Sequence, residues 1–347
     1  MSIRGQHILS SEQFSLDVLN ELFRISDLLV PVARGEKYTR ILEGAVLGSL
    51  FFEASTRTRL SFDAAFLRLG GKVSHTTGVT FSSIVKGESL ADTSRVIGGY
   101  VDMLVIRHPE ESAVYDIAAA TNIPVINGGN GAGEHPTQAL LDIYTIRNEM
   151  ARLGKSIDGR RVALVGDLRY GRTIHSLIRL LSLYRDLTLV LIAPPALELP
   201  EKYVDLAERR GHRIIRTSDL RQGLAGCDLV YTTRVQRERF PEGAEPVSYT
   251  SEFRINRQLV DACCPPDIVI MHPLPRDSRP EANDLSDDLD GDPRLAIFRQ
   301  TDAGVPTRMA LFAMVLGVED RIEQSLQPAR WWRPAKIGPK DTDFQRG

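Results

Sequence analysis

The stretch at residues 51–62 constrains the fold of this chain more than any other. An apolar run, residues 45–52, predicts a buried strand, and apolar side chains recur at helical spacing from Leu60 onward. Between strand and helix lie small hydroxylated residues and two arginines, Arg57 and Arg59. Free backbone N–H groups, the positive end of a helix dipole and a guanidinium are what a phosphate group needs. We therefore predict an anion site where this strand ends and the helix begins.

The ordinary alternative for this stretch is a helix N-cap, because Ser and Thr are common capping residues. A cap needs only one hydroxyl, whereas the stretch offers Ser55, Thr56 and Thr58 beside the two arginines. The anion site is therefore the favoured interpretation.

Strands alternate with helices along both halves of the 347-residue chain. This pattern predicts an α/β fold with two similar-sized three-layer domains, each with a mainly parallel sheet flanked by helices. The expected ranges are 1–150 for a first domain, about 305–318 for a helix that returns to it, 151–304 for a second domain, and 319–347 for an appended tail with Trp331 and Trp332. Residues 278–293 are acidic and contain prolines, which predicts a mobile segment.

Further polar clusters follow the other predicted strands. They are Arg107, residues 135–138, residues 167–172, residues 234–236 and residues 272–276. Ligands of parallel sheets bind beyond the carboxyl ends of the strands, so these clusters are candidate binding residues. Those in the first half suit a phosphate and a carbonyl group, and the arginines of the second half suit one or two carboxylates.

Composition and missing motifs exclude several classes of protein. A net charge of -2 predicts no basic surface for nucleic acid or membrane. The three cysteines lack metal-ligand spacing and favour a reducing cytoplasm, and the N-terminus lacks a signal core. The chain has no P-loop, no complete dinucleotide fingerprint and no nucleophile elbow. We expect neither a cofactor nor a metal.

These motifs resemble those of the aspartate/ornithine carbamoyltransferase family over about residues 5–318. The matching segments are Ser55–Arg59, Arg107–Pro109, His135–Gln138, Gly166–Thr173, Thr233–Gln236 and His272–Pro275. The last three favour aspartate as the second substrate, and Pro273 stands where ornithine enzymes usually carry a cysteine. The resemblance implies transfer of the carbamoyl group of carbamoyl phosphate to the α-amine of L-aspartate, in pyrimidine biosynthesis. It also implies direct attack through a tetrahedral intermediate.

The resemblance implies a role for each residue that matches the carbamoyl phosphate motifs. The phosphate would be bound by Ser55, Thr56, Arg57 and Thr58. The carbonyl oxygen, and the charge that develops on it, would be held by Thr58, Arg107 and His135. The carbamoyl amino group would be held by Gln138 and the backbone carbonyls of Leu274 and Pro275. By spacing alone His135 would more often be a structural histidine, and Gln138 a surface residue.

The resemblance also implies residues for the acceptor and for assembly. The two carboxylates of aspartate would be bound by Arg172, Arg234 and Gln236. A neighbouring subunit of a homotrimer would contribute Ser82 and Lys86. Glu53 would pair with Arg172 or Arg239 when the domains close. The resemblance, rather than spacing, raises Lys86 and Gln236 above ordinary surface residues.

Some features depart from the family pattern and leave alternatives open. Ala54 stands where the family often has proline, and the residues after Arg276 differ near the amino-acid site. A transcarbamylase for a different amino-acid acceptor is one alternative. A non-catalytic scaffold subunit is another, and a nicotinamide dehydrogenase is disfavoured by the missing glycine fingerprint. Regulatory or other pyrimidine-pathway subunits stay open as partners.

Overall fold

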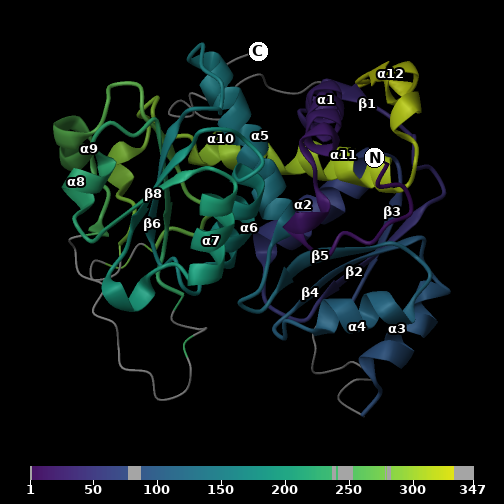
Figure 1. Ribbon diagram of the computed structural model, residues 1–347. Helices are drawn as coiled ribbons and strands as arrows, with labels where there is room; N and C mark the ends of the chain where they lie inside the picture. Colours follow the sequence, from purple (N-terminus) through teal and green to yellow (C-terminus); the bar gives the residue numbers. More distant parts are fainter. Residues whose placement is uncertain are drawn as a thin grey trace. The chain divides into compact units, whose positions relative to one another are not determined.

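The computed structural model describes residues 2–76, 87–236, 240, 253–277, 279 and 283–331. The chain forms two compact units. The first contains Met1–Leu140 and the later segment that starts at Asp302, and the second contains Leu141–Thr301. Each unit has a parallel sheet flanked by helices (Figure 1), so the predicted α/β fold class is confirmed.

The sheet of the first unit has four parallel strands in the order β3-β2-β4-β5. Their bounds are Val46–Phe51 for β2, Lys72–His75 for β3, Met103–His108 for β4 and Val125–Asn130 for β5. The apolar run predicted as a strand is thus β2, whose four central residues are buried. The N-terminal segment extends the β5 edge, because Ile8 bridges to Ile126 in parallel.

Helices cover both faces of the first sheet (Figure 1). Their bounds are Leu16–Ala33 for α1, Thr56–Arg68 for α2, Leu90–Gly98 for α3, Ala113–Ala120 for α4 and Gly304–Val315 for α11. Helices α3 and α4 pack together on one face, and α11 packs between α1 and α2 on the other. Phe312 of α11 contacts the rings of Phe62 and Phe66, with centroids 5.9 and 5.1 Å away. The late helix is therefore part of the first core.

Part of the predicted tail packs against the first unit. A 3-10 helix at Glu319–Arg321 leads into α12, Ile322–Ser325, whose Ile322 is fully buried. Strand β11, Gln327–Pro328, then pairs antiparallel with β1, Lys37–Tyr38. Trp331 lies against Tyr38, with ring centroids 6.2 Å apart. Residues 319–331 are thus integrated into this unit.

The sheet of the second unit has five parallel strands in the order β10-β9-β6-β7-β8. Their bounds are Arg161–Gly166 for β6, Thr188–Ile192 for β7, Arg213–Thr217 for β8, Leu229–Thr233 for β9 and Val269–Met271 for β10. All of β9 and β10 is buried, as expected for strands covered on both faces, and the edge strand β10 is bridged by Leu295 at Ile270.

Helices flank the second sheet, as the predicted alternation of strands and helices requires. Helix α5, Pro136–Arg152, begins in the first unit and continues into the second. The others are Arg172–Leu181 for α6, Glu201–Arg209 for α7, Leu220–Leu224 for α8, Arg257–Cys263 for α9 and Ile297–Asp302 for α10. Short 3-10 helices lie at Pro195–Leu197 and Asp287–Leu289. Sequence analysis did not predict α9 and α10, which have seven and six residues.

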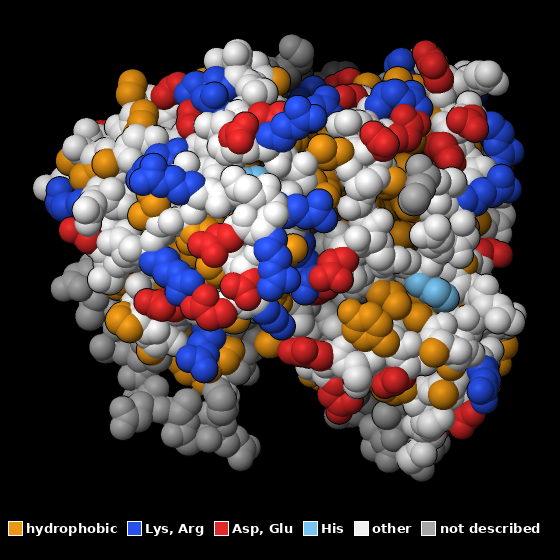
Figure 2. Space-filling model, viewed as in Figure 1, with side chains coloured by type: hydrophobic (Ala, Val, Ile, Leu, Met, Phe, Trp, Pro, Cys, Tyr) orange, Lys and Arg blue, Asp and Glu red, His pale blue; other side chains and the backbone are white. Residues whose placement is uncertain are grey.

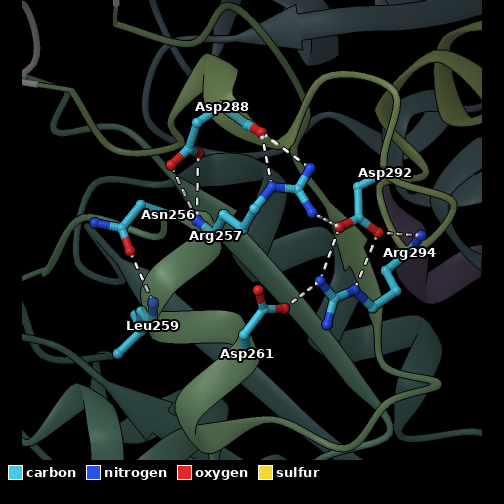
Figure 3. A network of polar contacts seen from close by, with 7 residues as sticks. All are labelled: Asn256, Arg257, Leu259, Asp261, Asp288, Asp292 and Arg294. Atoms are coloured by element: carbon cyan, nitrogen blue, oxygen red, sulfur yellow. Dashed lines mark hydrogen bonds and ion pairs between the residues drawn. The ribbon is translucent and has the colours of Figure 1, made fainter.

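In the described part of the acidic segment, residues 283–293, the carboxylates form hydrogen bonds and ion pairs with arginines (Figure 3). Asp288 accepts hydrogen bonds from the backbone N–H of Arg257, and its carbonyl accepts from the Arg257 guanidinium. Asn256 caps α9 by accepting from the N–H of Leu259 at 2.8 Å. The prediction of a mobile segment is therefore wrong over these residues, because carboxylates that looked solvated have arginine partners.

Asp292 is the centre of this polar network (Figure 3). Its buried carboxylate accepts from Arg257 Nη1 at 2.8 Å and from Arg294 Nε and Nη2 at 3.0 and 2.8 Å. Arg294 also pairs with Asp261 of α9 at 2.6 Å. Hydrogen bonds from Arg294, and then the charges of both arginines, lower the pKa of Asp292.

Replacing Asp292 with Asn should destabilise the second unit by about 2 kcal/mol near neutral pH, since hydrogen bonds to charged groups contribute roughly that much. The pKa of Asp292 is lower in the folded protein than in the unfolded one. Its contribution is therefore present above the unfolded pKa of about 4 and is lost as the pH falls through the folded value. Urea unfolding of both proteins over a pH series measures the difference.

The control for this experiment is Glu201→Gln, which breaks an exposed pair with Arg216 at 2.6 Å. Exposed pairs contribute little, so this variant should unfold like the wild type. A stability difference for Asp292→Asn that does not shrink in acid would contradict the assignment.

Candidate functional site

The end of β2 and the end of β4 lie side by side in the first unit. Parallel register places Phe51 opposite Arg107. The next N–H, that of Phe52, donates to the carbonyl of Arg107 at 2.8 Å. The predicted anion-binding stretch and Arg107 therefore meet at the carboxyl edge of this sheet.

The N-terminus of α2 fits an anion site better than an ordinary cap. Ser55 is the N-cap residue, yet in the described part of the chain its hydroxyl makes no capping bond to the helix. The first turn contains no acidic side chain, and Thr56 and Arg57 are exposed. The positive end of the helix dipole at this N-terminus, which no acidic side chain of the first turn offsets, favours an anion.

Glu53 orients Arg107. Its Oε2 accepts from Arg107 Nε at 2.9 Å, and the two side chains are 29% and 11% exposed. The partners predicted for Glu53 were Arg172 and Arg239, so Arg107 is a partner that sequence reasoning missed. Because this ion pair uses Nε, the terminal nitrogens of the Arg107 guanidinium can still donate to a ligand oxygen.

The N-terminal segment of the chain holds the segment that contains His135 and Gln138. His135 is buried and precedes Pro136, the first residue of α5, and its carbonyl accepts from the N–H of Gln138 at 3.0 Å. The preceding residue, Glu134, accepts from Ser10 Oγ at 2.7 Å and from the N–H and Oγ of Ser11 at 2.8 and 2.7 Å. The N-terminal segment therefore holds this part of the site in place.

In the second unit, Asp167 joins two of the predicted segments. Its buried carboxylate accepts from the N–H of Tyr170 and from the N–H of Gln236, both at 2.9 Å. Gly171 is needed in this turn because a Cβ there would lie 2.4 Å from the Asp167 carbonyl. Arg172 follows as the first residue of α6 and is buried. The turn after β6 and the segment after β9 are thus held together.

Arg234 and Gln236 are also linked to each other. Gln236 Nε2 donates to the carbonyl of Arg234 at 3.0 Å, and Arg234 Nη1 donates to the carbonyl of Val235 at 3.1 Å. With Arg172 at the N-terminus of a helix, this edge of the second sheet has the cations and the helix dipole that carboxylates require.

The third segment of this edge follows β10. The peptide bond between Leu274 and Pro275 is cis, and His272 beside them is buried. Hydrogen bonds from Arg279, with a further contribution from the charge of Arg234, lower the pKa of Asp277. Because β10, β9 and β6 are neighbours, the three segments of the second unit share one edge.

The structure groups the predicted residues in two sets, one at the carboxyl edge of each sheet. Ser82, Lys86 and Arg239 lie outside the described residues. Sequence reasoning missed the supporting carboxylates Glu134 and Asp167, although both stand inside or next to a quoted motif. Both carboxylates are buried, and burial is the property that would have indicated a supporting role. A short stretch of sequence does not show burial.

The described part of the chain also bears on metal binding, membrane crossing, disulfide bonds and surface charge. None of its clusters of His, Cys, Asp and Glu side chains could hold a metal ion. Within these residues no helix combines the length and apolar character that a membrane crossing requires. Cys227, Cys263 and Cys264 are free thiols. On the face in Figure 2, positive and negative side chains are interspersed over the described residues.

Comparison with known proteins agrees with this geometry. The family model for the carbamoyl-P binding domain of aspartate/ornithine carbamoyltransferase matches residues 6–148, and the model for the Asp/Orn binding domain matches residues 158–315. The chain is 51% identical over 332 residues to the aspartate carbamoyltransferase catalytic subunit of Saccharophagus degradans, covering 96% of this chain and 98% of that one. It is 54% identical over 344 residues to that of Dichelobacter nodosus, covering 99% of each.

Solved structures give the same result. Aspartate transcarbamoylase from Trypanosoma cruzi in complex with carbamoyl phosphate superposes with a TM-score of 0.83 at 39% identity, covering 90% of this chain and 97% of that chain. Its complex with N-(phosphonacetyl)-L-aspartic acid superposes with a TM-score of 0.79 at 37% identity, with the same coverage. The resemblance drawn from the motifs is confirmed: this chain belongs to the aspartate/ornithine carbamoyltransferase family.

Proposed function

We infer that this chain is an aspartate carbamoyltransferase catalytic subunit. It transfers the carbamoyl group of carbamoyl phosphate to L-aspartate and yields carbamoyl aspartate and phosphate. The observation that carries this conclusion is the 51% and 54% identity, over nearly the whole chain, to catalytic subunits that bear this name. The two edges described above supply the groups that such a reaction needs.

In this proposal, residues 1–150, with the returning helix at about 305–318, bind carbamoyl phosphate. Ser55, Thr56, Arg57 and Thr58 bind the phosphate at the N-terminus of α2. The first turn of that helix, which contains no acidic side chain, supports this role. Thr58, Arg107 and His135 hold the carbonyl oxygen. The Glu53 ion pair supports the role of Arg107, because it fixes the guanidinium at the sheet edge.

Residues 151–304 bind aspartate in the same proposal. Arg172 and Arg234 bind its two carboxylates, with Gln236 beside them, and the links through Asp167 support this arrangement. Gln138 and the carbonyls of Leu274 and Pro275 hold the carbamoyl amino group. We retain the prediction that Glu53 meets Arg172 or Arg239 when the domains close, which gives Glu53 a second task besides Arg107.

The proposed mechanism is direct attack of the neutral α-amine on the carbamoyl carbon. The new C–N bond forms a tetrahedral intermediate whose oxygen carries the negative charge and faces the donors Thr58, Arg107 and His135. The C–O bond to phosphate then breaks, and the phosphate takes the amine proton. Fixed donors aimed at the developing charge supply most of the acceleration in reactions of this kind.

We further propose a homotrimer whose active sites are shared between subunits, with Ser82 and Lys86 contributed by the neighbour. An exposed apolar face on α2 supports a subunit interface on this helix. Leu60 and Leu67 lie seven residues apart on one side of the helix and are 57% and 54% exposed. Regulatory or other pathway subunits, and the cytoplasmic location that the cysteines predict, stay as predictions.

The first test is the identity of the acceptor. Purified protein with carbamoyl phosphate and a panel of amino acids should release phosphate and form the carbamoyl product with L-aspartate, because the second unit supplies paired arginines for two carboxylates. Product formation is measured by mass spectrometry and phosphate release by a coupled assay. Turnover with another amine and none with aspartate would favour the alternative acceptor, and no turnover at all would favour the scaffold alternative.

Replacing Arg57 with Ala should lower kcat/KM by roughly 100- to 1000-fold, as the loss of one preorganised donor does in comparable sites. The matched control is Arg59→Ala in the same helical turn, where the side chain pairs with Asp63 at 4.0 Å. The control should retain activity and lose only the weak effect of a partly exposed ion pair. Equal losses for the two variants would contradict the assignment of Arg57.

The shared site can be tested by mixing inactive subunits. Arg57→Ala and Lys86→Ala should each be inactive as pure trimers. After the two are dissociated, mixed and reassembled, some interfaces should pair an intact Arg57 with an intact Lys86, and activity should return. Each variant reassembled alone is the control. A mixture that stays inactive, although hybrid trimers are seen by native mass spectrometry, would place both residues in one subunit's site.

A further inference from the structure

The imidazole of His272 makes two buried hydrogen bonds of opposite kind. Its Nδ1 accepts from the N–H of Leu274 at 2.8 Å, so this nitrogen carries no proton. The proton is on Nε2, which donates to Oδ2 of Asp284 at 2.7 Å. His272 and Asp284 are 1% and 0% exposed. The ring is therefore neutral, with its tautomer fixed by both neighbours.

The other oxygen of Asp284 extends this arrangement. Oδ1 accepts from the N–H of Asp277 at 3.1 Å and from the N–H of Leu285 at 2.9 Å. The turn at residues 274–277 is thus held at its first residue by His272 and at its last by Asp284. The bond between the imidazole and the carboxylate joins the two supports.

Leu274 needs such support because of its backbone conformation. Its φ is 50°, in the left-handed region that a bulky side chain rarely adopts. Such a conformation persists only where the surroundings fix it. The N–H of Leu274 is fixed by His272 Nδ1, so the directions of the peptide groups that follow depend on this bond.

His272 is itself anchored in the interior of the second unit. Its N–H donates to Gln300 Oε1 at 2.9 Å, and Gln300 Nε2 donates to Asp142 Oδ1 at 2.7 Å. Asp142 also accepts from the hydroxyl of Tyr231 at 2.7 Å. His272 directly follows β10, the other three residues come from α10, α5 and β9, and all four are buried. The imidazole is therefore a rigid support for the turn.

We propose that His272 is a positioning residue that aims the carbonyls of Leu274 and Pro275 at the carbamoyl amino group. The proposal rests on the proposed function, in which those two carbonyls accept hydrogen bonds from the substrate. His272 acts through the turn and does not touch the substrate. Carbonyl acceptors discriminate an amino group only when they are held in the right direction before it binds.

Two substitutions separate the bonds of the imidazole. His272→Asn places an amide oxygen near the position of Nδ1 and keeps an acceptor for Leu274, but it loses Asp284. His272→Gln reaches toward Asp284 with an amide donor and loses the acceptor for Leu274. Both variants should lower the midpoint of thermal unfolding. Only His272→Gln should raise KM for carbamoyl phosphate, with kcat/KM about 100-fold lower, the loss expected from a misplacement of about 1 Å.

The matched control is His212→Gln. His212 is also buried, and its Nδ1 accepts from the N–H of Leu187 at 3.3 Å, at the amino ends of β8 and β7. The substitution removes the same kind of bond at the opposite edge of the sheet. It should lower the unfolding midpoint and leave KM for carbamoyl phosphate unchanged.

Crystal structures of the two His272 variants complete the test. The carbonyl of Leu274 should keep its direction in His272→Asn and turn away in His272→Gln. Equal kinetics for the two variants, or an unmoved carbonyl in His272→Gln, overturns the proposal. The wild-type protein is assayed alongside, and a wild type without turnover on aspartate refutes the proposed function while the crystal structures still decide the role of His272.

Discussion

In each of the two larger sheets, neighbouring strands run in the same direction, so their carboxyl ends lie along one edge. Parallel pairing alone brings Arg107 next to the end of β2, although more than fifty residues separate them in the chain. The same constraint gathers the turns after β6, β9 and β10 at one edge of the second sheet. Every proposed substrate contact in the described residues depends on this arrangement or on the helix that starts from it.

Buried carboxylates stabilise these edges. Glu134 binds the N-terminal segment, Asp167 joins the turn after β6 to the segment after β9, and Asp284 holds the turn after β10. Each accepts at least one backbone N–H, which satisfies a polar group that would otherwise be costly to bury. Arg172 and Arg234 thus extend from backbone that Asp167 already fixes, and binding a substrate need not order that backbone first.

Sequence reasoning predicted the alternation of strands and helices because the strands are continuous apolar runs with polar breaks between them. It also predicted which segments carry the chemistry, since those segments follow strand ends. It missed the partner of Glu53, because Arg107 is close only after β2 and β4 have paired. It misjudged residues 283–293 for the same reason, since Arg257 and Arg294 neutralise carboxylates that look solvated in a linear sequence. Local pattern predicts elements, whereas long-range pairing decides which charges meet.

The path of the chain has a consequence for the order in which the protein can be completed during synthesis. Residues 8–11 find their partners on β5 and Glu134 only after more than a hundred further residues have been made. The core of the first unit also needs α11, which packs between α1 and α2 near the end of the chain. Within the described residues the second unit, by contrast, is one continuous segment, Leu141–Thr301. The unit that leaves the ribosome first is therefore the one that is finished last, and its apolar helix faces stay uncovered until then.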